Sequence, residues 1–177
     1  MNLHVPVRSR APLHELHPHD ADIAEFARDV IAGWSQPQKT LSPKYFYDAA
    51  GSEIFEEITR LPEYYPTRTE LGILRDRAAE IAALIPNDAA IVEFGAGATT
   101  KIRILLDAHP VAAYVPVDIS GDFLADQADA LRRDFPRLEV HPVAADFTKP
   151  FALPAAVSVR PKVGFFPGST LGNFEPQ

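Results

Sequence analysis

The chain has 177 residues, of which 46% are hydrophobic and 23% charged, with a formal net charge of −7 and no cysteine. This length predicts one domain with a small appendage, and the lack of cysteine excludes a disulfide framework, a thiolate metal site and a cysteine nucleophile. The chain has no basic stripe for nucleic-acid binding, no apolar run of the roughly 20 residues that span a membrane and no secretory signal pattern. We therefore expect a cytoplasmic protein that binds neither nucleic acid nor a membrane, and that holds no metal.

Residues 1–19 predict a loose tail, because their apolar residues follow no period. His14, His17 and His19 lie close together there, but no acidic or thiol ligand completes a metal site, so we expect a solvated tail. From Asp20 the apolar residues recur at helical spacing, and Gln36-Pro37 ends this first helix. The face that they form consists of Ile23, Phe26, Ala27, Val30, Ile31 and Trp34. A second short helix is predicted from Ser52.

A third helix has the clearest start signal. Thr67 and Glu70 have the spacing of a capping box, in which each side chain satisfies a backbone N–H at the beginning of the helix. Pro86 ends the helix, and its predicted buried stripe is Leu71, Leu74, Ala78, Ile81 and Ile85. Residues 20–86 are therefore expected to form a helical segment.

After Pro86 the pattern changes to alternating strands and helices. Four apolar runs predict buried strands, at residues 89–94, 113–117, 138–144 and 163–166. Strands that alternate with helices form crossover units and a parallel sheet, so residues 87–177 are expected to form an α/β domain. In such a sheet ligands bind at the carboxyl ends of the strands.

The first strand runs into Glu93-Phe94-Gly95-Ala96-Gly97, which predicts a ligand-binding loop. Glycines let the backbone approach a ligand closely, and the following helix offers free N–H groups. The dinucleotide fingerprint requires a third glycine where Thr100 stands, which counts against NAD. Glu93 suits a cofactor with a cationic amino-acid tail, such as S-adenosylmethionine. An ordinary tight turn between strand and helix remains the alternative.

Two further strand ends carry acidic residues. Asp118 follows the second strand at the distance from the glycines where an acid binds ribose hydroxyls, although an acid that stabilises a helix N-terminus gives the same pattern. Asp146 follows the third strand, where its carboxylate can accept a hydrogen bond from an adenine amino group. The backbone N–H of Phe147 can then donate to a ring nitrogen. The three strand ends together favour a methyltransferase-type cofactor site.

Small and aromatic residues predict a substrate side of the same site. Residues 168–173, Gly-Ser-Thr-Leu-Gly-Asn, leave space above the cofactor, and Asn173 offers both a donor and an acceptor. Tyr64 and Tyr65 stand between two prolines, which predicts an extended segment whose side chains point opposite ways. One tyrosine can therefore face a pocket while the other packs, and packing is at least as good an interpretation for Tyr65.

These motifs resemble those of the histidine-specific methyltransferases, the S-adenosylmethionine-dependent L-histidine Nα-methyltransferases of ergothioneine biosynthesis. The resemblance runs from about residue 20 to the end of the chain, and its most specific part is the proline-tyrosine segment. The matching stretches are residues 41–48, 51–52, 58–70, 92–97, 100–101, 116–118, 146–147 and 168–173.

The resemblance implies a Rossmann-like class I methyltransferase fold and assigns the site by matched position. The implied contacts to S-adenosylmethionine are Gly95, Lys101, Asp118, Asp146 and Phe147. The implied contacts to the amino-acid substrate are Tyr64, Asn173 and Tyr47, with Tyr47 near the amine. Members of the family are much longer, so the chain resembles an N-terminal fragment. The remaining sheet and the residue that recognises imidazole would lie in the absent C-terminal part, and we expect the fragment alone to be inactive.

The implied reaction is repeated methyl transfer to the α-amine of histidine, which gives the trimethylated betaine hercynine. A free α-amine has a pKa of roughly 8, so enough neutral amine exists without a strong base, and no catalytic base is assigned. Positioning is the expected catalytic device. Two alternatives remain open at this point: a nicotinamide-dependent oxidoreductase, and a non-catalytic module that binds S-adenosylmethionine.

Overall fold

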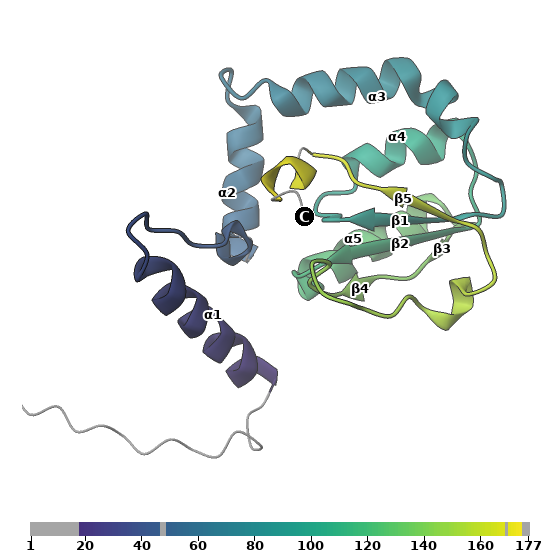
Figure 1. The fold of residues 1–177 in the computed structure, drawn as a ribbon. Coiled ribbons are helices and arrows are strands. Elements are labelled where there is room, and N and C mark those ends of the chain that lie inside the picture. The colour runs from purple at the N-terminus through teal and green to yellow at the C-terminus, as the bar shows by residue number, and fades with distance from the viewer. Residues whose placement is uncertain (1–17, 47–48, 169, 175–177) are drawn as a thin grey trace, which may run out of the picture. The chain divides into compact units, whose positions relative to one another are not determined.

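The computed structural model of the chain describes residues 18–46, 49–168 and 170–174. The tail up to residue 17 and Tyr47, which was assigned to the substrate, lie outside the described residues. The chain forms two compact units, Met1–Phe46 and Tyr47–Gln177, and each is described by itself (Figure 1). The predicted helical segment 20–86 is thereby divided, because its second and third helices are grouped with the sheet.

The first unit is a helix and a short return segment. Helix α1, Pro18–Trp34, ends just before Gln36-Pro37 as expected, and the 3-10 helix η2, Pro43–Phe46, follows. The Tyr45 hydroxyl donates to Asp29, and its ring contacts Phe26 with 4.8 Å between the ring centroids. Much of the predicted apolar face is exposed, since Ile31 and other large members are solvent-accessible. Polar and aromatic contacts therefore hold η2 on α1.

Two helices open the second unit, α2 at Ala49–Arg60 and α3 at Pro66–Ala82. The predicted extended geometry between them is wrong. Tyr65 has helical dihedral angles, φ −73° and ψ −21°, and the N–H of Tyr64 donates to the carbonyl of Leu61 at 3.1 Å. The Arg68 guanidinium donates to the carbonyls of Leu61, Pro62 and Tyr64 at 2.6–3.1 Å. These bonds replace the regular backbone pairing that the prolines interrupt, and they close the segment into a turn.

The predicted capping box at the start of α3 is also wrong. Tyr65 is the N-cap residue, no side chain caps the helix, and Pro66 occupies the first turn. Proline suits this position because its missing N–H is one that the helix could not pair. Glu70 is consequently available for contacts elsewhere, which are described below.

The sheet has the predicted parallel α/β topology. Its strands are β1 Ala90–Phe94, β2 Ala113–Asp118, β3 Glu139–Val140, β4 Val143–Ala144 and β5 Lys162–Phe165. The order is β3-β2-β1-β5, with β4 also paired to β2, and every pairing is parallel. The third predicted strand is split into β3 and β4 around Pro142, which has no N–H to donate to the ladder. The fourth predicted strand, β5, lies beside the first, β1.

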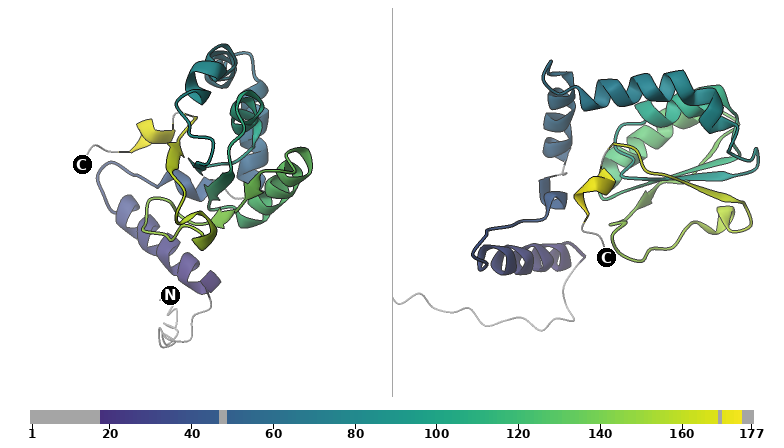
Figure 2. Two further views of the ribbon diagram at one scale, coloured as in Figure 1. Left: turned by 90° about the vertical axis from the view of Figure 1, so that its right-hand side faces the viewer. Right: turned by 45° about the horizontal axis from the view of Figure 1, so that its top comes forward.

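Different structures cover the two faces of the sheet (Figure 2). Helices α4, Thr100–Ala108, and α5, Gly121–Asp134, pack on one face with the end of α3. The other face is covered by the connection from β4 to β5, in which Val157 of the 3-10 helix η3, Ala155–Val157, is fully buried. The last crossover therefore contains no α-helix, and the aromatic residues of this connection take its place in the packing.

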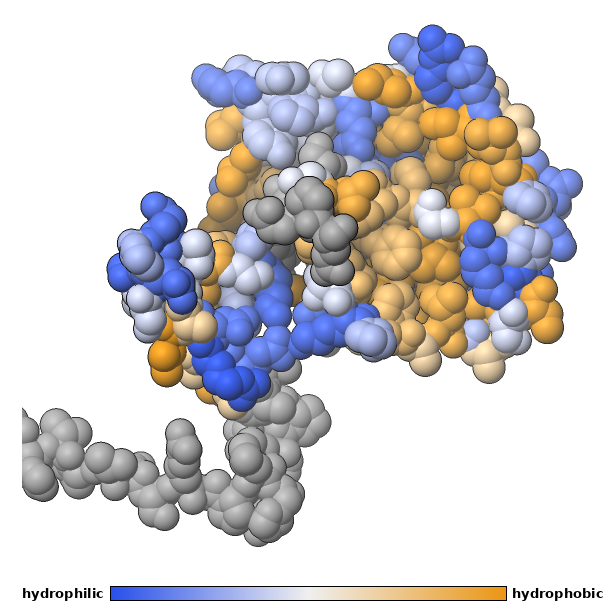
Figure 3. All heavy atoms as spheres, viewed as in Figure 1, coloured by the Kyte–Doolittle hydropathy of each residue, from blue (hydrophilic) through white to orange (hydrophobic). Residues whose placement is uncertain are grey.

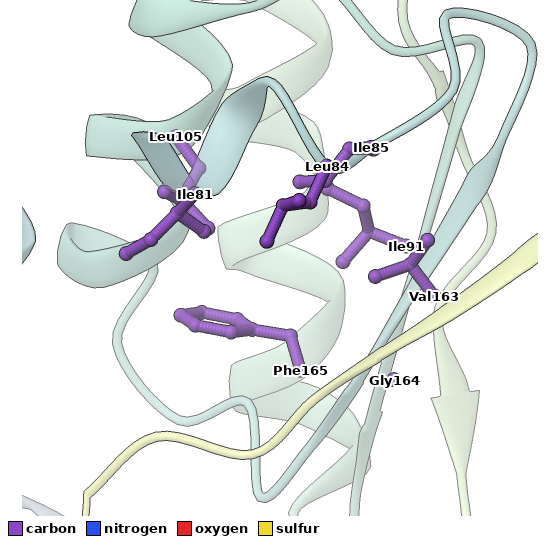
Figure 4. A pocket seen from close by; sticks show the side chains of 8 residues that line it. All are labelled: Ile81, Leu84, Ile85, Ile91, Leu105, Val163, Gly164 and Phe165. Atoms are coloured by element: carbon purple, nitrogen blue, oxygen red, sulfur yellow. The ribbon is translucent and has the colours of Figure 1, made fainter. Parts of the chain in front are cut away.

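Strand β5 forms an edge of the described sheet, because it pairs only with β1. Next to it lies an apolar pocket lined by Ile81, Leu84, Ile85, Ile91, Leu105, Val163, Gly164 and Phe165 (Figure 4). Figure 3 shows apolar side chains gathered over this side of the unit. Leu84 is 84% exposed and Val159 is 92% exposed. In the part of the chain that the structure describes, no helix is long and apolar enough to cross a membrane.

The 177-residue chain produced by itself is expected to self-associate, because an unpaired edge strand beside exposed apolar side chains recruits other chains. Leu84→Glu places a charge at the rim of the pocket and should shift the chain toward monomer in sedimentation velocity. Ile73→Glu on α3 is the matched control, since Ile73 is also exposed but does not line the pocket. A monomeric wild-type chain, or an equal effect of both variants, would contradict this expectation.

Candidate functional site

The loop after β1 has the geometry of a close ligand approach. Gly95 and Gly97 have positive φ angles of 70° and 38°, which favour glycine. The N–H groups of Gly95 and Ala96 both donate to the carbonyl of Val117 in β2, at 2.9 and 3.2 Å. The loop therefore turns back over the end of β2 instead of continuing the strand, and it brings its backbone beside Asp118.

Asp118 fixes the form of this loop at the end of β2. One carboxylate oxygen accepts the N–H of Gly97 at 3.3 Å, and the other accepts the N–H of Ser120 at 2.9 Å. The side chain is half-buried, so the carboxylate is held in place yet still reached by solvent. Each oxygen has a second lone pair available for a ligand hydroxyl. The structure thus brings together Gly95 and Asp118, two of the residues that the sequence assigned to the cofactor.

Asp146 and Phe147 lie beyond the end of β4. Asp146 accepts the N–H of Thr148 at 3.0 Å and the Thr148 hydroxyl, and it lies 3.6 Å from the ammonium of Lys149. These contacts form a tight local turn that contains Phe147 and fixes its position. A β-carbon built on Gly95 would lie 3.6 Å from the Phe147 ring, so this ring forms a wall directly beside the glycine loop.

A cluster of phenylalanines surrounds that wall. Phe147 contacts Phe94, Phe166 and Phe174 with ring centroids 5.4–6.1 Å apart, and Phe94 also contacts Phe151. Phe94 and Phe166 were predicted as strand residues, and their grouping with Phe147 was not predicted. The signal that could have found the cluster is the position of both rings at carboxyl ends of adjacent strands. The cluster supplies an apolar surface suited to a flat aromatic ring.

Lys101 lies in the first turn of α4, and its ammonium forms an ion pair with Glu70 of α3 at 2.7 Å. The other oxygen of Glu70 accepts the N–H of Gly168 at 2.7 Å. Gly168 follows β5 and has a φ of 90°. Three chain segments therefore meet at this carboxylate, which was predicted to cap a helix.

Glu93 is the buried acid of the site. It is 1% exposed, and the hydroxyl of Tyr114, which is fully buried, donates to it. Burial raises the pKa of Glu93 to about 8, while the Tyr114 hydrogen bond and the Lys101 charge lower it in part. Burial likewise raises the pKa of Tyr114 well above its usual value. Burial thus favours the neutral form of Glu93 in the folded chain.

The expected substrate residues are only partly described. Tyr64 is half-buried, with its ring edge against Phe55 at 6.0 Å between centroids. Tyr65 is 67% exposed. The expectation that its ring packs against neighbouring side chains is therefore wrong. Asn173 belongs to the 3-10 helix η4, Thr170–Asn173, and its side chain lies outside what the structure describes.

Comparison with known proteins gives a family match over residues 26–177, to the S-adenosylmethionine-dependent histidine-specific methyltransferases. The histidine N-alpha-methyltransferase of Mycolicibacterium smegmatis is 43% identical over 161 residues, and that of Mycobacterium tuberculosis is 41% identical over 165 residues. Both alignments cover 89% of this chain and 49% of the relative. The chain therefore spans about half the length of these curated relatives.

A third relative is ergothioneine biosynthesis protein 1 of Neurospora crassa, which is 40% identical over 82 residues, or 44% of this chain and 9% of the relative. The resemblance noted from the sequence is confirmed by these matches. The matched family consists of methyltransferases that depend on S-adenosylmethionine. The comparisons give no support to a nicotinamide-dependent oxidoreductase or to a non-catalytic module.

Glu93 is expected to make stability depend on pH. Because its folded pKa, about 8, lies above its unfolded value near 4.5, it stabilises the fold fully below pH 4.5. This stabilisation is lost as the pH rises to about 8, by up to about 1.4 kcal/mol per pH unit. Glu93→Gln mimics the neutral acid and should remove this slope in urea unfolding at pH 5.5 and 8.

The control is Glu57→Gln, which replaces an exposed glutamate of α2 and should retain the wild-type slope. An unchanged pH dependence in Glu93→Gln would show that Glu93 ionises in the folded protein as easily as in the unfolded chain.

Proposed function

The chain belongs to the family of S-adenosylmethionine-dependent histidine-specific methyltransferases, and on that premise we propose that the protein methylates the α-amino group of L-histidine. Three successive transfers would give Nα,Nα,Nα-trimethylhistidine, a step of ergothioneine biosynthesis. The proposal places this reaction in the cytoplasm. The observation that carries the proposal is the family match together with the Asp118 carboxylate beside the glycine loop.

The residues of the strand ends fit S-adenosylmethionine group by group. Asp118 would accept hydrogen bonds from the two ribose hydroxyls through its remaining lone pairs. Lys101 would pair with the α-carboxylate, which is the one anionic group of the cofactor. Asp146 would accept a hydrogen bond from the adenine amino group, and the N–H of Phe147 would donate to a ring nitrogen. The phenylalanine cluster provides an apolar surface for the adenine ring, and the absence of a side chain at Gly95 leaves room for the tail.

When bound, S-adenosylmethionine supplies an electrophilic methyl group on a sulfonium. The task of this chain is to hold a neutral amine in line with it, because alignment by itself removes much of the barrier of a two-reactant step. Tyr64, Asn173 and Tyr47 are proposed to contact the amino acid, with Tyr47 near the amine. No base is assigned, since a free α-amine with a pKa of roughly 8 is partly neutral at physiological pH.

The direct test is a methyl-transfer assay on the protein expressed from its complete reading frame, with histidine and other amino acids offered separately. Mass spectrometry should find mono-, di- and trimethylated histidine and little product from the other amino acids. Turnover of another amino acid in preference to histidine would overturn the substrate, and no methyl transfer to any amino acid would overturn the function.

Asp118→Ala is expected to weaken binding of S-adenosylhomocysteine at least tenfold, because it removes charge-assisted hydrogen bonds that each contribute roughly 1.5–3 kcal/mol. The variant also deprives the N–H groups of Gly97 and Ser120 of their acceptor. Asp118→Asn keeps one acceptor oxygen and should have an intermediate affinity in calorimetry. Asp107→Ala, at an exposed aspartate of α4, is the control. An unchanged dissociation constant in folded Asp118→Ala would remove Asp118 from the site.

Tyr64→Phe is expected to raise the apparent KM for histidine and to leave the affinity for S-adenosylhomocysteine unchanged. The substitution removes one hydroxyl and keeps the ring that packs on Phe55. Tyr65→Phe is the matched control at the exposed neighbouring ring and should alter neither constant. The opposite ranking of the two variants would assign the substrate contact to Tyr65.

A further inference from the structure

Glu70 joins three segments that the sequence separates widely. It belongs to the first turns of α3, and one of its carboxylate oxygens lies 2.7 Å from the Lys101 ammonium of α4. Its other oxygen accepts the backbone N–H of Gly168, just beyond β5, at 2.7 Å. Each oxygen thus has its own partner: Lys101 belongs to the helix that follows β1, and Gly168 follows β5, the strand paired with β1.

The surroundings make this junction tight. The side chains of Lys101 and Glu70 are 20% and 29% exposed, so solvent screens their attraction less than it screens a surface pair. A β-carbon built on Gly168 would lie 2.9 Å from the Lys101 ammonium nitrogen. The Lys101 ammonium therefore lies close against the backbone of Gly168. The carboxylate of Glu70 attracts the ammonium to this position.

We propose that Glu70 is a positioning residue, which holds the Lys101 ammonium at the carboxyl edge of the sheet so that it receives the cofactor carboxylate. This inference rests on the proposed function. An ammonium group has three N–H donors, so Lys101 can bind Glu70 and a ligand carboxylate at the same time. A free lysine side chain has large rotamer freedom, and ligand binding would have to remove it. Glu70 removes that freedom before the ligand arrives.

The same carboxylate also anchors the segment that begins at Gly168 and leads to Asn173. A single residue of α3 thereby connects the cofactor side with the proposed substrate side. The turn that Arg68 closes sets the start of α3, and Glu70 lies on this helix five residues after Tyr65.

The test is a double-mutant cycle on S-adenosylhomocysteine affinity, measured by calorimetry on the protein from its complete reading frame. Glu70→Gln should weaken binding about five- to tenfold, and Lys101→Met about tenfold or more. In the Lys101→Met background, Glu70→Gln should change the affinity less than about twofold, because its effect passes through Lys101. Glu80→Gln on the same helix, where Glu80 pairs with exposed Arg77, should have no effect.

A residue that only braced the fold would lower the melting temperature and weaken binding equally in both Lys101 backgrounds, which would overturn the proposal. If Glu70 merely competed with the ligand for Lys101, Glu70→Gln would bind more tightly, which would also overturn it. If the wild-type protein does not bind S-adenosylhomocysteine at all, the proposed function fails, whereas binding that is insensitive to Glu70 refutes only the positioning role.

Gly168→Ala is a second variant that tests the proposal if Glu70→Gln does not fold. Its added methyl group would displace the Lys101 ammonium and would also strain the backbone, whose φ is 90°. Only the first effect disappears with Lys101→Met, so the proposal predicts weaker binding of S-adenosylhomocysteine in the wild-type background and little further loss with Lys101→Met. Gly72→Ala on α3, where an added methyl meets nothing within 4 Å, is the control. Unchanged affinity in folded Gly168→Ala would count against the proposal.

Discussion

The parallel pairing of β1 with β2 is the constraint on which the site depends. Its register sets Phe94 opposite Val117, so that the two strands end together and the chain after each must turn away from the sheet. The glycine loop makes its turn by donating two N–H groups to Val117, and the Asp118 carboxylate then accepts the N–H of Gly97. The glycine loop and the Asp118 carboxylate hold each other in place. Both positions would be lost if the register between β1 and β2 shifted.

The rest of the second unit is arranged around this edge. Strand β5 pairs with the free side of β1 and brings Gly168 to the same end of the sheet. Helix α3 reaches that end through Glu70, and the connection after β4 reaches it through Phe147 and its aromatic neighbours. On the helix-covered face, Glu93 and Tyr114 form a buried polar pair beneath the loop. A buried pair of this kind must satisfy its own hydrogen bonds, which makes its geometry specific.

Local sequence patterns could predict most of the second unit. Alternating apolar runs gave the parallel strands and the crossovers α4 and α5, and acidic residues at strand ends pointed to the ligand edge. These features depend on neighbours in the sequence, and the register of a parallel sheet then brings them together. The proline-tyrosine segment was predicted wrongly because Arg68, through bonds to three carbonyls, outweighs the extended preference of residues before proline.

The contacts that patterns could not predict are those between distant segments. The spacing of Thr67 and Glu70 fits a helix cap, and nothing near Glu70 in the sequence indicates that it binds Lys101 and Gly168 instead. The phenylalanine cluster likewise joins residues from three segments, and each alone resembles an ordinary core residue. Burial decides the charge of Glu93, and burial at that depth follows from the packing of α4 and α5 on the sheet.

The most direct test of the account is residue-resolved: NMR of protein labelled with 15N-glycine, titrated with S-adenosylhomocysteine. The sample is the protein from its complete reading frame, in which this chain contributes nine glycines. If the carboxyl edge of β1, β2 and β5 is the cofactor site, the amide signals of Gly95, Gly97 and Gly168 will shift on saturation while those of Gly33 and Gly72 stay in place. Saturable binding that leaves Gly95 and Gly97 unmoved would contradict the account.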